Sequence, residues 1–127
     1  MRLSKRTEQA IDMLVVLADV PQMTLAQLAM RTMTPKKTAE IVVAQLRRER
    51  LVTSKRGPRG GYRLARPAAE IRAVDIVEAI EGKLFPHHGD ESPAVRRCKN
   101  MAAAAMIHDL DIRLSELTPR PNAEVRG

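Results

Sequence analysis

The chain has 127 residues, of which 44% are hydrophobic, and a formal net charge of +7. This length predicts one compact domain with an appended arm, and no apolar run reaches the roughly 18 residues needed to cross a bilayer. A single cysteine, Cys98, excludes an internal disulfide, so we expect a cytoplasmic protein of a reducing compartment that does not associate with membranes.

A first helix is predicted from Ser4, which is placed to cap it, to Pro21, which ends it. The basic and then apolar start resembles a signal peptide superficially. However, Glu8, Gln9 and Asp12 interrupt the apolar run, and no small-residue cleavage site follows. Its apolar face is broad, so we expect burial on more than one side, at positions Ala10, Ile11, Leu14, Val15, Leu17 and Ala18.

Two further helices with a short link are predicted next. Thr24 and Gln27 form a capping-box pattern that starts a helix from about Leu25 to Arg31. Thr34 is expected to cap a third helix, with Pro35 at its first position, that runs to about residue 50. The short link predicts a helix-turn-helix. The expected inward face of the third helix is Thr38, Ile41, Val42, Gln45 and Leu46.

A β-hairpin should follow the third helix. Residues 51–55 alternate and predict a strand, residues 57–61 (GPRGG) predict a turn, and residues 62–65 predict the returning strand. Three helices followed by a hairpin is the element order of a winged helix-turn-helix. The predicted fold class is therefore mainly α, with a small β-hairpin wing and a long C-terminal helix.

Residues 47–66, which we call the basic segment, coincide with this hairpin. They hold eight Lys or Arg and one acid, whereas the other 107 residues hold 14 basic and 14 acidic side chains. Charge so localised predicts a surface for phosphates. The alternative is a solvated hairpin that happens to be basic.

The C-terminal part is predicted to start with a fourth helix, residues 74–81, that Gly82 ends. After a linker (83–91), a last helix should begin at Ser92 or Pro93. We predict a DNA-binding domain over 1–82 and a linker, dimerisation helix and tail over 83–127. A heptad-like spacing of 4, 3, 4 and 3 predicts the dimer interface, formed by Ala103, Ile107, Leu110, Leu114 and Leu117.

Several of these stretches carry a resemblance to a known family. Residues 1–4 (MRLS), 46–52, 56–67 (RGPRGGYRLARP) and 75–82 (DIVEAIEG) are similar to the Rrf2 family of bacterial transcription regulators. The resemblance implies a homodimer in which each subunit presents a winged helix-turn-helix to double-stranded operator DNA and the long C-terminal helix crosses its partner. It implies regulation of transcription, and we expect repression.

Many members of this family carry three cysteines that hold an iron–sulfur cluster, and this chain departs from that pattern. The common Cys-x5-Cys-x5-Cys spacing, placed on Cys98, meets Ser92 and Ala104, which do not replace thiolates. We therefore expect no such cluster, no other cofactor and no bound metal. A second departure is Arg50, where the family usually has the Gly that caps the helix.

The sequence leaves several alternatives open for how the protein senses a signal. The cations beside Cys98 favour its thiolate, so it is a candidate redox sensor, or a cysteine without a role. A metal site of His87, His88, Asp90, Glu91 and Cys98, and a mixed-ligand cluster of Cys98 with Glu8, are weaker hypotheses. Six of the seven methionines are either core fillers or the lining of a small-molecule effector cavity: Met13, Met23, Met30, Met33, Met101 and Met106.

Candidate DNA contacts come from three places. At the start of the third helix, Lys36 and Lys37 lead and Thr38 ranks lower, while Glu40 is either a cytosine contact or solvated. In the wing, Arg59 either enters the minor groove or clamps a phosphate. The remaining candidates are phosphate contacts or allow close backbone approach: Ser4, Lys5, Arg6, Arg47, Arg56, Gly60, Gly61 and Arg63.

Other function classes have weaker support. The sequence contains no nucleophile–base–acid arrangement and no phosphate-binding glycine loop that leads into a helix, so we predict that the protein is not an enzyme. The main alternative is a winged-helix assembly module whose basic surface binds an acidic protein.

Overall fold

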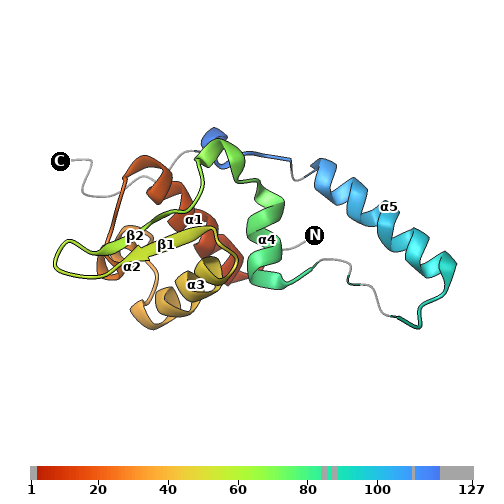
Figure 1. Cartoon of the computed structure of the whole chain (residues 1–127), viewed down its shortest axis with the longest axis horizontal. Coiled ribbons are helices and arrows are strands. Elements are labelled where there is room, and N and C mark those ends of the chain that lie inside the picture. Colours follow the sequence, from red (N-terminus) through yellow and green to blue (C-terminus); the bar gives the residue numbers. More distant parts are fainter. Residues whose placement is uncertain (1–2, 84–85, 87–88, 110, 118–127) are drawn as a thin grey trace.

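The computed structural model describes residues 3–83, 86, 89–109 and 111–117. Helices and a hairpin form one body, and a long helix extends from it (Figure 1). None of the described helices combines the length and the apolar character required to cross a membrane. In chain order the elements are α1 Lys5–Asp19, α2 Leu25–Arg31, α3 Lys36–Arg48, β1 Val52–Lys55, β2 Gly61–Leu64, η1 Ala68–Glu70, α4 Ala73–Glu81, α5 Pro93–Asp109 and η2 Leu114–Glu116.

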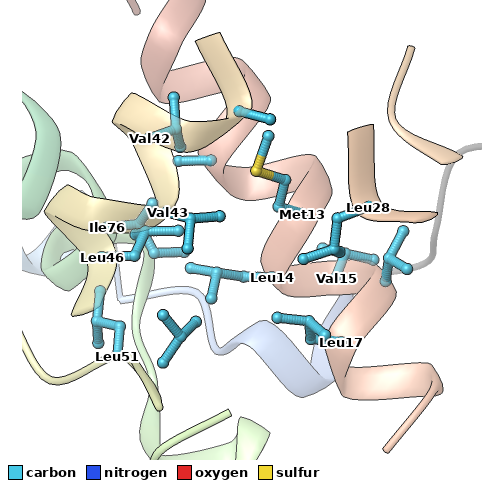
Figure 2. Packing of buried hydrophobic residues seen from close by; sticks show 14 of the residues in the cluster. Met13, Leu14, Val15, Leu17, Leu28, Val42, Val43, Leu46, Leu51 and Ile76 are labelled. Carbon is cyan, nitrogen blue, oxygen red and sulfur yellow. The ribbon is translucent and has the colours of Figure 1, made fainter. Parts of the chain in front are cut away.

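Helix α1 lies at the centre of the body and contacts α2, α3, α4, β2 and η2. Figure 2 shows Met13 and Leu14 of α1 facing Val42, Val43 and Leu46 of α3. All of these side chains are at most 2% exposed. The core is aliphatic apart from the methionines, in a chain that has only one Tyr, one Phe and no Trp, and it fixes α3 and the hairpin relative to α1.

Helix caps explain where α1 and α2 begin. The Ser4 hydroxyl accepts a hydrogen bond from the Thr7 backbone N–H at 3.2 Å, which confirms the predicted cap of α1. Thr24 and Gln27 form the predicted capping box of α2, with bonds of 2.9 and 3.2 Å. Each cap satisfies N–H groups that the first helical turn leaves without an intrahelical partner.

The predicted start of the third helix is wrong by one residue. Pro35, not Thr34, is the N-cap of α3, and no side chain caps this end. The Thr34 hydroxyl instead lies 3.0 Å from that of Thr32 in the link between α2 and α3.

The predicted inward face of α3 is also shifted. The buried side chains are Ala39, Val42, Val43 and Leu46, whereas Ile41 is 41% exposed. Both sets of positions fit a helical period of 3.6 residues, but only the buried set is entirely apolar. Because of this shift, Ile41 belongs to the surface and not to the core.

The hairpin pairs Val52 with Leu64 and Lys55 with Gly61 in antiparallel register. Met23, in the segment before α2, adds a third short partner, because its N–H and C=O both bond to Tyr62, at 3.0 and 2.7 Å. The hairpin is therefore attached to the helical body near its tip as well as at its base.

The prediction of one continuous last helix through Leu117 is wrong. Helix α5 ends at Asp109, and Leu114 lies in the short 3-10 helix η2, only 1% exposed. Its N–H donates to the Ile71 carbonyl at 2.8 Å, which brings the chain back to the body. Leu114 is thus a core residue of its own body, and Leu117 packs partly buried against the same core.

The rest of the predicted dimer seam has a mixed outcome. Ala103 is half-buried on α5, Leu110 lies outside the described residues, and the side chain of Ile107 is likewise not described. Helix α5 stands away from the body in Figure 1, and its Val95 and Met101 side chains are 45% and 64% exposed.

Candidate nucleic-acid interface

The amino-terminal end of α3 combines exposed cationic side chains with backbone N–H groups that no side chain caps. Lys36 and Lys37 form its first turn and are both exposed, whereas Thr38 is half-buried. Because no side chain caps this end, its N–H groups and the positive end of the helix dipole are available to an anion. This end of α3 is suited to phosphate oxygens and to acceptors on base edges.

The link between α2 and α3 fixes the orientation of this helix. The Thr32 hydroxyl donates to the Leu28 carbonyl at 2.7 Å, and the Thr34 N–H donates to the Ala29 carbonyl at 2.9 Å. Thr32 and Thr34 are 4% and 5% exposed. Between them Met33 adopts a positive φ of 53°, which turns the chain sharply enough to place α3 across α2.

A stripe along α3 faces away from the core. It consists of Lys37, Ile41, Ala44 and Arg48, all exposed and spaced 4, 3 and 4 residues apart, which is the spacing of one helix face. We call this set the outer stripe of α3. It is cationic at both ends and apolar in the middle.

The wing presents its cations on an exposed face. Thr53, Lys55 and Arg63 alternate outward along the two strands, and Arg56 and Arg59 belong to the turn between them. Figure 1 shows the tip of the hairpin on the same side of the molecule as the start of α3. The structure therefore brings the predicted wing and the predicted recognition helix toward one common face.

Two glycines allow the hairpin to close against its neighbours. A Cβ on Gly60 would lie 2.3 Å from the Lys55 carbonyl oxygen, and one on Gly61 would lie 2.6 Å from that of Met23. Gly61 also has a φ of +148°, which L side chains rarely adopt. In this structure both glycines serve the internal packing of the wing.

Gln22 supports the tip from outside the hairpin. Its side-chain amide donates to the backbone carbonyl of Arg59. This contact crosses 37 positions of sequence and holds the turn against the segment between α1 and α2. The sequence contains no local signal for it.

Arg47 lies apart from the other α3 candidates. It is in the last turn of α3. Because a helix rises about 1.5 Å per residue, Arg47 lies about 16 Å along the helix axis from Lys36. There it lines an open groove of about 780 Å³ together with Arg50, Thr53 and Arg66. This groove is cationic, but it lies at the base of the hairpin.

The three candidates at the chain start are not brought to the wing. Lys5 and Arg6 are exposed in the first turn of α1, and the Ser4 hydroxyl is occupied by the α1 cap. In Figure 1 the start of α1 lies on the α4 side, opposite to the wing tip.

Cys98 is exposed on α5. Two of its neighbouring cations are engaged, because Glu91 forms ion pairs with Lys99 at 2.6 Å and with Arg96 at 3.7 Å. These pairs reduce the positive potential that the sequence places around the thiol.

The residues present do not fit a three-thiolate iron–sulfur cluster. Ser92, at one of the positions that such spacing requires, accepts the Val95 N–H at 3.2 Å and starts α5, and Ala104 offers no donor atom. Among the described residues no group of three or more His, Cys, Asp or Glu side chains could hold a metal ion. His87 and His88 lie outside the described residues, and Glu8 is exposed on α1.

Sequence reasoning missed Ile41 and Arg48 of the outer stripe, and Gln22. For Ile41 and Arg48 the sequence holds only a weak signal: the set Ala39, Val42, Val43 and Leu46 is apolar throughout, but the helical period alone does not select it. For Gln22 the sequence holds no such signal.

Comparison with protein families gives one match over most of the chain. The model of the Rrf2 family, described as iron-dependent transcriptional regulators, matches residues 3–116. The HTH-type transcriptional regulator IscR of Cereibacter sphaeroides is 40% identical over 93 residues, which are 69% of this chain and 60% of that protein. For two relatives from Mycobacterium tuberculosis the share of the relative is 54%, so the chain spans little more than half of these proteins.

Solved structures agree with this match. CymR, the global cysteine regulator of B. subtilis, is similar with a TM-score of 0.71 and 28% identity, over 91% of this chain and 94% of that one. The IscR of T. potens has a TM-score of 0.70 and 28% identity, over 91% of this chain and 84% of that one. The winged helix-turn-helix architecture predicted from the element order is confirmed.

Proposed function

Because the chain belongs to the Rrf2 family of transcriptional regulators, we propose that it is a sequence-specific DNA-binding regulator and not an enzyme. One observation supports the proposal: the uncapped, lysine-bearing start of α3 and the arginine-rich wing lie on the same side of one packed body. A recognition helix then enters the major groove, and the wing follows the adjacent backbone or minor groove.

Each candidate residue has its own role in this proposal. Lys36 and Lys37 contact base edges and nearby phosphates from the start of α3. Arg59 contacts the minor groove or a phosphate from the wing tip, and Arg56 and Arg63 contact phosphates beside it. Three candidates lie at the periphery, namely Arg47, Lys5 and Arg6. They contact flanking phosphates only if the DNA bends toward them.

We propose further that the protein acts in the cytoplasm as a homodimer that represses transcription. Helix α5 supports the dimer, because it stands off the body and exposes the apolar side chains Val95 and Met101, which a second copy would cover. Cys98 is the candidate for redox sensing, since it is exposed on the same helix. Such a signal would act without a three-thiolate cluster.

Binding to the DNA upstream of the protein's own gene tests this function. Purified protein should shift that fragment in a gel at concentrations that leave a scrambled duplex of equal length unbound, and it should lower transcription of a reporter placed behind the fragment. An unshifted fragment, with capture of an acidic protein instead, would support the assembly-module alternative.

A further inference from the structure

The outer stripe of α3 contains an apolar side chain where charges are expected. Ile41 is 41% exposed in the middle of the helix, between Lys37 one turn before it and Ala44 and Arg48 after it. The four residues on the opposite face are buried, so a rotation of α3 that hides Ile41 would expose Val42 or Val43. The exposure of Ile41 is therefore imposed by the core.

The major groove offers one apolar group for such a side chain. Thymine carries a 5-methyl group in the major groove, and none of the other three bases has a methyl group there. A branched aliphatic side chain can bury this methyl group by van der Waals contact, but it cannot bond to the polar base edges. The chemistry of Ile41 thus selects thymine among the four bases.

The neighbours of Ile41 fit this placement. Ala44, the next residue on the stripe, has a side chain too short to hold the helix off the bases. Lys37 and Arg48, at the two ends of the stripe, have flexible cationic side chains that reach phosphates on either side of the groove. The stripe combines an apolar centre for reading a base with charged ends for holding the backbone.

From this arrangement we propose that Ile41 is a specificity-determining residue that reads the 5-methyl group of a thymine in each operator half-site. The inference rests on the proposed function, and it adds a base preference to it. It predicts that the operator has a thymine in each half-site whose methyl group contributes to affinity.

Replacing thymine by uracil tests the inference, because only the methyl group is removed and base pairing is kept. Each thymine of the half-site is replaced in turn, and the dissociation constant is measured by fluorescence anisotropy. At one or two positions, removal of the methyl group should weaken the binding of wild-type protein about fourfold. Ile41→Ala should bind the thymine and uracil duplexes equally at those positions, and Ile41→Val should keep most of the wild-type response.

Ile112→Ala is the matched control, because Ile112 is the same residue type, 42% exposed, and lies outside α2 and α3. This variant should respond to uracil as the wild type does. The inference is overturned if no uracil substitution weakens wild-type binding, or if Ile41→Ala keeps the full wild-type response. Failure of the proposed function has a different signature, since no protein would then bind the duplex at all.

Discussion

The side chain of Gln22 donates to the backbone carbonyl of Arg59, and so joins the segment between the first two helices to the tip of the wing. The contact is exposed and does not involve the guanidinium group. It restricts where the wing tip lies, and it leaves the Arg59 guanidinium available to the proposed duplex.

Removing this hydrogen bond should weaken DNA binding without unfolding the protein. Gln22→Ala deletes one exposed hydrogen bond, whose net contribution is about 0.5–1 kcal/mol, and it leaves the tip freer in the unbound state. We expect a two- to fivefold increase in the dissociation constant for the operator, as about 0.5–1 kcal/mol implies, and a melting temperature lowered by only a few degrees. Binding equal to the wild type would show that the tip needs no such support.

Gly61→Ala should destabilise the fold itself. The new methyl group would lie 2.6 Å from the Met23 carbonyl oxygen at a φ of +148°, so the Met23–Tyr62 pairing must shift. The expected loss of unfolding free energy is about 1–3 kcal/mol, measured by urea denaturation. Gly89→Ala is the control, because a Cβ there meets no atom within 4 Å, and this variant should unfold as the wild type does.

How far the sequence predicts this structure differs from element to element. The α2 capping box, Gly82 after α4 and the glycine-rich turn of the wing are local signals, and each lies where the sequence predicts it. The basic segment likewise depends only on residue type. These features follow from chemistry within a few residues.

Two features required tertiary information. Along α3 two sets of positions fit the helical period, and packing against α1 and α4 selects the set that contains Ala39 and Val43. The heptad spacing continues to Leu117 without a helix breaker, yet the chain leaves the helix at Asp109. There, pairing with the backbone of Ile71 and burial of Leu114 outweigh two more helical turns.

Arg50 is, with Met33, one of the two non-glycine residues of the described ranges that have a positive φ. It has a φ of +60° two residues after the end of α3, a conformation that costs a non-glycine residue about 1–2 kcal/mol. Arg50→Gly should therefore raise the unfolding free energy by about 0.5 kcal/mol or more, after the larger entropy that glycine loses on folding. Ala44→Gly, inside α3, should lower it by about 1 kcal/mol. Equal changes in the unfolding free energy for the two glycine substitutions, measured by urea denaturation, would contradict the positive φ of Arg50.

Leu114→Ala tests whether this leucine belongs to the core or to a dimer seam. Because Leu114 is 1% exposed within its own body, truncation should leave a cavity and cost about 2–4 kcal/mol of unfolding free energy. This destabilisation should not depend on protein concentration. Val95→Ala, on the exposed part of α5, should leave the body as stable as the wild type. A concentration-dependent effect for Leu114→Ala would return this residue to the dimer interface.

The salt dependence of operator binding tests the central claim most directly, namely that α3 and the basic wing of each subunit grip a duplex. If a dimer neutralises about six phosphates or more, affinity should fall about a thousandfold between roughly 50 and 200 mM salt. Arg59→Ala should bind more weakly by over about 1 kcal/mol, with a shallower slope if Arg59 contacts a phosphate. An operator affinity that does not change with salt, in wild type and variant alike, would contradict the account.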